Sequence, residues 1–510
     1  MHKNRYIILI HIAILLVCNY SFSQTKKTEP KKKKTTTINI KQADYLTFDK
    51  SKSDAQILKG NVICEHEGAL LYCDSALLFS SKRMEAGGNI RIVKGDSITV
   101  TGDKLFYDAN TKLAALEGNV VCVEKDMTLK TPILTFDITN SIASYYNGGT
   151  IVNKDNTLSS KNGHYYSSGK DLYFHYDVEL VNPDYKMKSD TLRYNVSNKT
   201  SYFYGPSIII SKEDYIYCEN GYYNTDQEIA SFNKNALLVT KNQKLRGDSL
   251  YYDRLNQFGK AYNNVSLVDT SQKSILYGNY IEYHQKNSEA FVTDKALYAY
   301  LFEKDTLFLH ADTLFHKDID SVTNYLRAFR NVKIFKTDLQ AVCDSANFNG
   351  LDSLLKLYNN PIIWSNNSQG TGSLIQIKMA EKSIRSFELI KNAFLINNTD
   401  TVNKKYNQMS CQKIEAFFEN DTIRSAFLRG NVEMLYYVKN ENKWTGLNNT
   451  ICSQVNAYFK IEEIHKTTLL SKPKGTIKPM LELKEEDLYL KGFNWMPNKR
   501  PKSKSEVFDN

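Results

Sequence analysis

A single pattern recurs about every 29 residues along most of this 510-residue chain. Its most complete copy opens with Gly88-Asn89-Ile90, continues through Asp103 to Asp108, and restarts at Gly118-Asn119-Val120. A repeat of this length that fills most of a chain predicts a solenoid, in which each copy packs mainly against its neighbours. We interpret the longer intervals after Ala296 as loop insertions. Fourteen positions can be aligned as equivalent: Val62, Ile90, Val120, Thr150, Val178, Ser207, Ala236, Val265, Ala296, Val332, Pro361, Ala393, Val432 and Thr476.

The middle of each copy alternates apolar and polar residues with a period of two. The second and fourth residues after a recurring Asp are the pairs Ala76/Leu78, Leu105/Tyr107, Leu192/Tyr194, Leu250/Tyr252, Leu314/His316 and Ala346/Phe348. This alternation predicts strands with one buried face, because a helix would not keep both members of a pair on one side. Gly and Asn at the openings supply turn residues that tolerate a positive φ. The sequence therefore predicts an elongated all-β solenoid.

The recurring Asp residues are predicted to be structural. We interpret Asp74, Asp103, Asp190, Asp248, Asp312 and Asp344 as turn residues at strand starts, which bond their own backbone. A glycosidase would instead need two carboxylates at one place. The histidines are scattered without metal-ligand spacing, and no catalytic triad or phosphate-binding loop is recognisable. We therefore predict a protein that is not an enzyme, with no catalytic residues, no metal site and no cofactor.

The net charge of +10 is concentrated at the two ends of the chain. Residues 1–34 and the basic polar tail 491–510 carry the excess of Lys and Arg, so residues 35–490 are neutral overall. Nucleic-acid binding would need clustered positive charge on the fold itself, and we predict no nucleic-acid partner.

The N-terminus has the pattern of a secretory signal peptide. Lys3 and Arg5 precede an apolar run from Tyr6 to Val17, and Ser21-Phe22-Ser23 supplies small residues for cleavage after Ser23. We expect residues 1–23 to be a cleaved signal peptide, 24–37 a Lys/Thr-rich linker, and 38–490 a run of about 14 repeats without a second domain boundary. A signal peptide implies export from the cytoplasm.

Seven of the eight cysteines remain after removal of the signal peptide. An odd number cannot pair completely within one chain. Five of the seven fall at one position of the repeat, which favours a recurring structural position over a metal site: Cys73, Cys218, Cys343, Cys411 and Cys452.

The apolar residues of the middle strands have two interpretations. They either fill a closed interior or line an open groove for an acyl chain. The candidate groove residues are Leu78, Leu105, Tyr107, Leu192, Tyr194, Leu250, Tyr252, Leu314 and Phe348.

The signal peptide, the Gly-Asn-Val openings (residues 60–62, 118–120 and 430–432) and the Asp-x-Leu-x-Tyr strands (103–107 and 248–252) together resemble the OstA/LptA family of lipopolysaccharide-transport proteins. The resemblance covers nearly all of residues 40–490. It implies a twisted β-jellyroll of two facing antiparallel sheets, with lipid A acyl chains in the groove between them. It also implies a location in the periplasm, either free or at the outer membrane, and other lipopolysaccharide-transport components as partners. An open solenoid leaves unpaired strand edges at both ends, which we expect to be the docking surfaces, and we expect either a monomer or a head-to-tail oligomer.

Two other classes of function stay open. A non-catalytic structural or adhesive β-solenoid would have a closed, dry core. A β-helical enzyme acting on polysaccharide would show Asp, Lys and Arg clustered on adjacent rungs, which the sequence does not show. Whether the interior is open therefore separates lipid binding from scaffolding.

Overall fold

The computed structural model describes residues 37–508 except 52, 96–97, 213, 321–322, 381–383, 420–421, 442 and 461–462. Nearly all regular structure in these residues is antiparallel β-strand, with five single-turn 3₁₀ helices, as the all-β prediction requires. None of the helices in this part of the chain has the length and apolar character needed to cross a membrane. The predicted signal peptide, 1–23, and residues 24–36 of the predicted linker lie outside the described residues.

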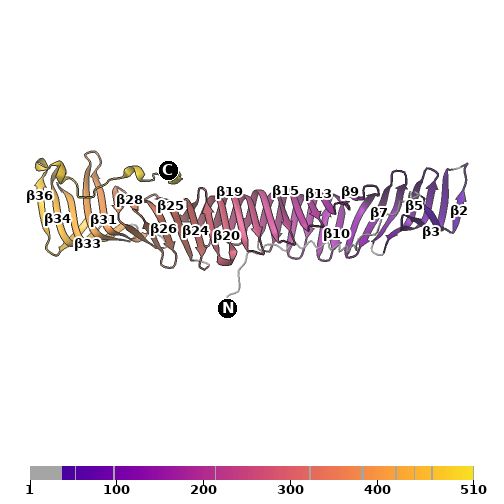
Figure 1. Cartoon of the computed structure of the whole chain (residues 1–510), viewed down its shortest axis with the longest axis horizontal. Helices are drawn as coiled ribbons and strands as arrows, with labels where there is room; N and C mark the ends of the chain where they lie inside the picture. The colour runs from indigo at the N-terminus through magenta and orange to yellow at the C-terminus, as the bar shows by residue number, and fades with distance from the viewer. Residues whose placement is uncertain are drawn as a thin grey trace, which may run out of the picture. The chain divides into compact units, whose positions relative to one another are not determined.

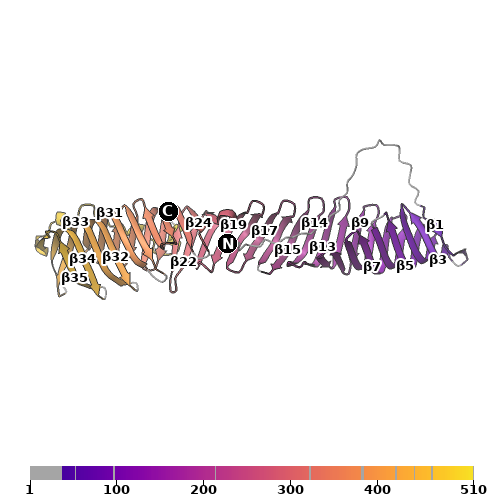
Figure 2. The ribbon, with the colours of Figure 1, turned by 90° about the horizontal axis from the view of Figure 1, so that it is seen from below.

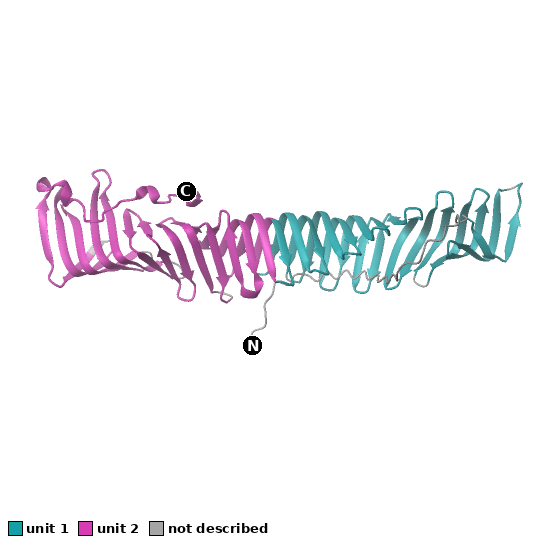
Figure 3. Ribbon diagram, viewed as in Figure 1, with its two compact units in different colours: residues 1–241, 249–256 teal, residues 242–248, 257–510 magenta. Residues whose placement is uncertain are grey.

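The chain divides into two compact units (Figure 3). Unit 1 comprises residues up to 241 together with 249–256, and unit 2 comprises 242–248 and 257–510. Within each unit, the strands follow one another in chain order (Figures 1 and 2).

Unit 1 holds the first seventeen strands and the second half of β18. Their bounds are β1 Asn39–Gln42, β2 Tyr45–Phe48, β3 Ala55–His66, β4 Ala69–Phe79, β5 Arg83–Lys94, β6 Ile98–Asp108, β7 Leu113–Glu124, β8 Met127–Asp137, β9 Ile142–Tyr146, β10 Gly149–Asn153, β11 Asn156–Ser160, β12 Asn162–Tyr166, β13 Asp171–Val181, β14 Tyr185–Asn195, β15 Thr200–Ser211, β16 Tyr215–Asn224, β17 Ile229–Val239 and β18 Gln243–Asp253.

Unit 2 holds the remaining strands and the 3₁₀ helices. Their bounds are β19 Phe258–Asp269, β20 Ser274–His284, η1 Gln285–Asn287, β21 Glu289–Thr293, β22 Leu297–Leu301, β23 Thr306–His310, β24 Thr313–Asp318, β25 Asn324–Lys336, β26 Leu339–Asn349, β27 Leu354–Tyr358, β28 Ile362–Ser365, β29 Ser368–Thr371, β30 Leu374–Met379, β31 Ile384–Asp400, β32 Lys405–Glu419, β33 Thr422–Asn440, β34 Lys443–Lys460, β35 Glu463–Leu470, β36 Lys474–Pro479, η2 Met480–Glu482, η3 Glu485–Asp487, η4 Pro497–Lys499 and η5 Ser505–Phe508.

The Gly-Asn openings are corners within strands. In β7, residues 113–117 pair with 133–137 of β8, whereas residues 120–124 pair with 127–131 of the same strand. The register skips Gly118 and Asn119, whose φ angles are 77° and 46°. The predicted positive φ is confirmed, but it bends a continuous strand, as a β-bulge does, rather than ending one.

The corners divide the strands of unit 1 between two facing walls. We call wall 1 the ladder that contains residues 113–117, and wall 2 the ladder that contains residues 120–124. Tyr145 of wall 1 reaches across the interior to Ser160 of wall 2, with 2.6 Å between the two hydroxyl oxygens. Two facing antiparallel sheets, expected from the family resemblance, are therefore present in unit 1.

The interpretation of the recurring Asp residues as turn residues at strand starts is wrong for five of the six, which lie in the middle of strands, whereas Asp312 directly precedes β24. Asp74 lies in the middle of β4, opposite the corner of β5, and Asn89 Nδ2 of that corner donates to Asp74 Oδ2 at 2.8 Å. The strand begins earlier than the Asp because residues 69–73 already pair with 62–66. The same Asn-to-Asp bond occurs at 2.8 to 3.4 Å in the pairs Asn61–Asp44, Asn119–Asp103, Asn264–Asp248, Asn331–Asp312 and Asn359–Asp344.

The corners confirm most of the repeat alignment. Twelve of the fourteen aligned positions directly follow a pair of positive-φ residues or, for Ser207, the pair Gly205-Pro206. The two others are shifted. Gly149, rather than Thr150, follows the corner at residues 147–148, where three small turn-forming residues in a row obscure the register. The last corner is at residues 471–472, so Thr476 is not equivalent, and neither corner residue there is Gly or Asn.

The interpretation of the late, longer intervals as loop insertions is wrong for the last repeats. Strands β31 to β34 contain 17, 15, 19 and 18 residues, whereas β3 to β8 contain 11 or 12. The extra residues lengthen the sheet itself. Strand periodicity continues through such additions, so the interval alone does not distinguish a longer strand from a longer loop.

The five cysteines predicted to share one structural position do so. Each pairs with the first residue after a corner, as Cys73 does with Val62 and Cys452 with Val432. All seven cysteines of the described residues are free thiols. Burial raises the pKa of Cys73 to about 12, so the thiol is protonated and acts as a small apolar side chain.

Candidate binding groove

An apolar cavity of about 460 Å³ lies between the two walls of unit 1. We call it the groove. Its lining from wall 1 includes Met84, Leu105, Ala114, Leu116, Leu134, Phe136, Ala143, Tyr145, Leu172 and Phe174. Its lining from wall 2 includes Cys64, Leu71, Ile92, Val100, Cys122, Leu129 and Ile151. Alternate residues of each strand contribute because successive side chains point to opposite faces of a sheet.

Aromatic side chains close the groove at the end formed by β9 to β15. The ring of Tyr145 lies between Gly149 and Gly163, where an added Cβ would stand 2.4 Å and 2.2 Å from ring atoms. Tyr194 of β14 and Phe203 of β15 are also buried. A second cavity, of about 40 Å³, lies among Leu158, Leu172, Phe174, Leu192 and Tyr194.

A hydrogen-bonded chain joins the two walls at the mouth of the groove. Tyr107 Oη of wall 1 lies 2.9 Å from His66 Nε2 of wall 2, and His66 Nδ1 lies 3.1 Å from the carbonyl oxygen of Thr37. The carbonyl can only accept, so the His66 tautomer that makes both bonds donates from Nδ1 and accepts a hydrogen bond from the Tyr107 hydroxyl at Nε2. Burial, with Glu67 and Asp108 nearby, raises the pKa of Tyr107, which keeps this hydroxyl protonated.

Charged residues of the lining gather at the strand ends farthest from the corners. Among the described lining residues, Glu65, Glu67 and Glu124 are acidic and Lys94 is basic. The groove thus combines an apolar interior with a polar mouth, which suits an amphiphile with a hydrocarbon part. The mouth carries more negative than positive charge, so it offers no net attraction to an anionic headgroup.

The structure brings together only some of the predicted site residues. Leu105 and Tyr107 line the groove, and Leu192 and Tyr194 line the small second cavity beyond it. Leu78 is half-buried in wall 1 and lines neither cavity. Leu250, Tyr252, Leu314 and Phe348 line neither cavity, and Leu250 and Leu314 are buried by neighbouring protein. A lipid-binding role for these nine residues remains a prediction.

Sequence reasoning missed the whole contribution of wall 2. Cys73, Gly102 and Thr131 each pair with the first residue after a corner. The groove residues Leu71, Val100 and Leu129 stand two residues before them. Extending the two-residue alternation to the other side of each corner would have identified these wall 2 residues. The role of Tyr145 as an end wall had no such signal, since Tyr is frequent along the chain.

Comparisons with known proteins agree with the repeat pattern. Residues 35–190 and 189–248 match a family model described as OstA-like protein. Among solved structures, the chain is similar to LptH of Pseudomonas aeruginosa, described as the LptA homologous periplasmic component of the conserved lipopolysaccharide transport device. The identity is 12%, over 21% of this chain and 81% of that chain, with a TM-score of 0.20. No curated protein matches.

Proposed function

On the premise that residues 35–248 form an OstA-like region, we propose that this chain binds the acyl chains of lipopolysaccharide in the groove of unit 1 and serves in lipopolysaccharide transport. The observation that carries the proposal is the groove itself, apolar along both walls and polar at its mouth. The proposal places the protein in the periplasm, on the way to the outer membrane, and assigns it no catalytic step.

Burial of hydrocarbon supplies the affinity. Each methylene removed from water contributes about 0.8 kcal/mol, so about ten methylenes contribute roughly 8 kcal/mol before the cost of association is subtracted. The carboxylates of Glu65, Glu67 and Glu124 at the mouth add no attraction for lipid phosphates. The sugar and phosphate groups stay in solvent outside the groove.

Two adjacent alanines of β7 provide a matched test. Ala114 lines the groove, and Ala115 points to the opposite face of the same strand. Ala114→Trp fills the groove and is expected to reduce binding of fluorescent lipopolysaccharide to the purified protein by at least about tenfold, whereas Ala115→Trp leaves it unchanged. Equal binding by both variants, with both folded by circular dichroism, would reject the groove as the lipid site.

The proposed route to partners is strand addition at the two ends of the strand series. Tyr45, Leu46 and Phe48 of β2 are exposed, and Tyr45 is 72% exposed. A strand edge with exposed apolar residues is a template for a strand of another chain, whether another transport component or a second copy. A photo-crosslinker at position 45 is expected to capture a protein partner in cells. One at Phe106, exposed on wall 1 in β6, four strands from the β2 edge, is the control; equal capture at both would contradict the idea.

A further inference from the structure

The segment after the last strand does not trail away as a polar tail. Residues 480–508, which we call the strap, run back along unit 2 and end near β23 and β25 (Figure 1). The strap lies on a ladder that runs from residues 332–336 of β25 to residues 474–479 of β36, which we call wall 2 of unit 2. It forms no β-ladder with these strands, since its regular structure is four 3₁₀ turns.

Three glutamines on every second strand of this wall, β26, β29 and β32, bond the strap. Gln408 Nε2 donates to the Leu488 carbonyl at 2.7 Å, and Leu490 N donates to Gln408 Oε1 at 2.9 Å. In the same way, Gln369 Nε2 donates to the Asn494 carbonyl and Met496 N donates to Gln369 Oε1, both at 2.7 Å. These two glutamines are 0% and 1% exposed, so their amides are satisfied by the strap within the protein interior.

The third glutamine binds a strap side chain. Arg500 Nε donates to Gln340 Oε1 at 2.7 Å, and its Nη1 donates to the Asn366 carbonyl at 2.7 Å. Gln340, Gln369 and Gln408 each stand three residues before the residue paired with a corner, so they occupy one position of the repeat. The position one residue further along each strand faces the interior, as Leu71 and Leu129 do in unit 1. Successive side chains point to opposite faces of a sheet, so the three glutamines point away from the interior.

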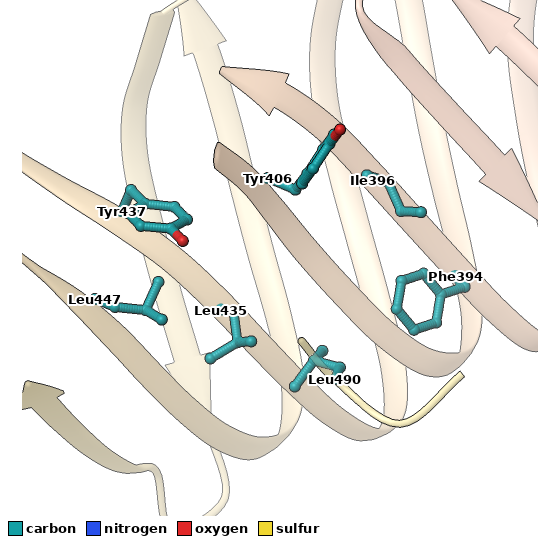
Figure 4. Packing of buried hydrophobic residues seen from close by; sticks show 7 residues of the cluster. All are labelled: Phe394, Ile396, Tyr406, Leu435, Tyr437, Leu447 and Leu490. Atoms are coloured by element: carbon teal, nitrogen blue, oxygen red, sulfur yellow. The ribbon is translucent and has the colours of Figure 1, made fainter. Parts of the chain in front are cut away.

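Apolar side chains of the strap insert between those of the wall. Leu490 packs against Phe394, Ile396, Leu435 and Leu447 in a buried cluster, with Phe493 and Trp495 at its border (Figure 4). The rings of Tyr406 and Phe493 have centroids 5.2 Å apart. Apolar contacts and glutamine hydrogen bonds therefore recur every few residues along the strap. Contacts spaced in this way are typical of a protein surface that binds an extended peptide.

We propose that this face of unit 2 is a peptide-binding site and that the strap is its separable ligand, so that the face also takes the strap of a second copy of the chain. The contacts are those of a ligand with a site: paired bonds to the backbone, a buried apolar anchor and a charged end at Arg500. They do not depend on which molecule supplies the segment, a condition for exchange between identical chains. The link to β36 runs through η2, where Leu481 is fully exposed between Met480 and Leu483, which pack at the border of the cluster, so a cut after Leu481 leaves the buried members of the cluster in place.

The test starts from the full chain with a protease site inserted after Leu481. After cutting, the strap is expected to stay with the body in gel filtration and to be displaced by an excess of a labelled peptide of residues 482–508, with saturable, one-to-one binding. A scrambled peptide is expected not to bind. Gln369→Met and Gln408→Met are each expected to weaken peptide binding about tenfold, since each removes two hydrogen bonds to the strap. Gln376→Met, in β30 of the opposite ladder, is the matched control.

Exchange between copies is tested by mixing. A cut chain freed of its strap is combined with an uncut chain carrying Gln369→Arg and Gln408→Arg, whose own strap has lost its site, and a one-to-one complex is expected by light scattering. Absence of that complex would contradict exchange between copies. If the cut, folded body captures no labelled peptide, or if cutting alone abolishes the near-ultraviolet circular dichroism of the body, the strap is an integral part of the fold and the proposal is wrong.

Discussion

Replacement of the corner glycine Gly88 by Ala tests the corner geometry most sharply. Gly88 has a φ of 77°, a conformation that costs an L-residue about 1–2 kcal/mol. A Cβ at this position would also stand 2.3 Å from Asp74 Oδ2 and 2.9 Å from Asp74 Cβ, within the neighbouring strand. Such crowding typically costs about 1–3 kcal/mol. Together the two effects predict that Gly88→Ala destabilises the protein by about 2–5 kcal/mol.

Gly68 separates the two effects. Its φ is 80°, but no atom lies within 4 Å of the position its Cβ would occupy, so Gly68→Ala has only the conformational cost of about 1–2 kcal/mol. The assay is thermal unfolding followed by far-ultraviolet circular dichroism, with urea unfolding to obtain free energies. A double-mutant cycle of Gly88→Ala with Asp74→Gly, which removes the crowding atoms, should show a favourable coupling of about 1–3 kcal/mol. Equal destabilisation by Gly88→Ala and Gly68→Ala, with no coupling to Asp74, would refute the reasoning.

Three further predictions concern the mouth of the groove and acidity. Tyr107→Phe removes the hydrogen bond to His66 and is expected to lower the free energy of unfolding, measured by urea unfolding, by about 1 kcal/mol. The same variant is expected to speed lipid entry, measured by stopped-flow fluorescence. An unchanged free energy of unfolding would contradict a stabilising role of this bond. Lipid binding is expected to hold or increase from 0.05 to 0.5 M salt, since screening removes repulsion at the acidic mouth, and a steep loss with salt would contradict an affinity based on hydrocarbon burial. Burial lowers the pKa of His164 and His310 below the ordinary value of 6.5, so the unfolded chain takes up their protons first as the pH falls. Stability is therefore expected to decrease as the pH falls from about 7 through 6.5 toward the lower folded pKa values, and a His164→Gln/His310→Gln variant should show a flatter decrease in thermal unfolding.

The sequence was sufficient to predict the all-β class and the position of most corners. Val62, Ile90 and Val120 follow Gly-Asn pairs, and the residue after a corner is buried in each case. The residue to which each recurring Asp side chain is hydrogen-bonded could not be predicted in the same way. Asp74 bonds a corner fifteen residues ahead, and a short-range turn explains the same residue type equally well until the strand pairing is known.

The extent of the groove depends on packing that a two-residue period does not encode. Leu105 and Leu314 occupy the same repeat position, yet Leu105 lines a cavity and Leu314 is fully buried by protein. The alternation gives the inward positions but not what fills the space opposite them, as the ring of Tyr145 does between Gly149 and Gly163. Residues 491–510 were predicted to be a polar tail because charged residues are frequent there, whereas Phe493 and Trp495 of this segment pack against a buried apolar cluster.

Photo-crosslinking in cells tests the central proposal, lipid in the groove of unit 1, most directly. A crosslinker replaces Leu105, which lines the groove, or Lys104, which is exposed on the opposite face of the same strand. A third variant carries it at Leu314, buried in unit 2. The account predicts that lipopolysaccharide is captured at position 105 and at neither 104 nor 314. Equal capture at 104 and 105, or capture at 314 without capture at 105, would contradict it.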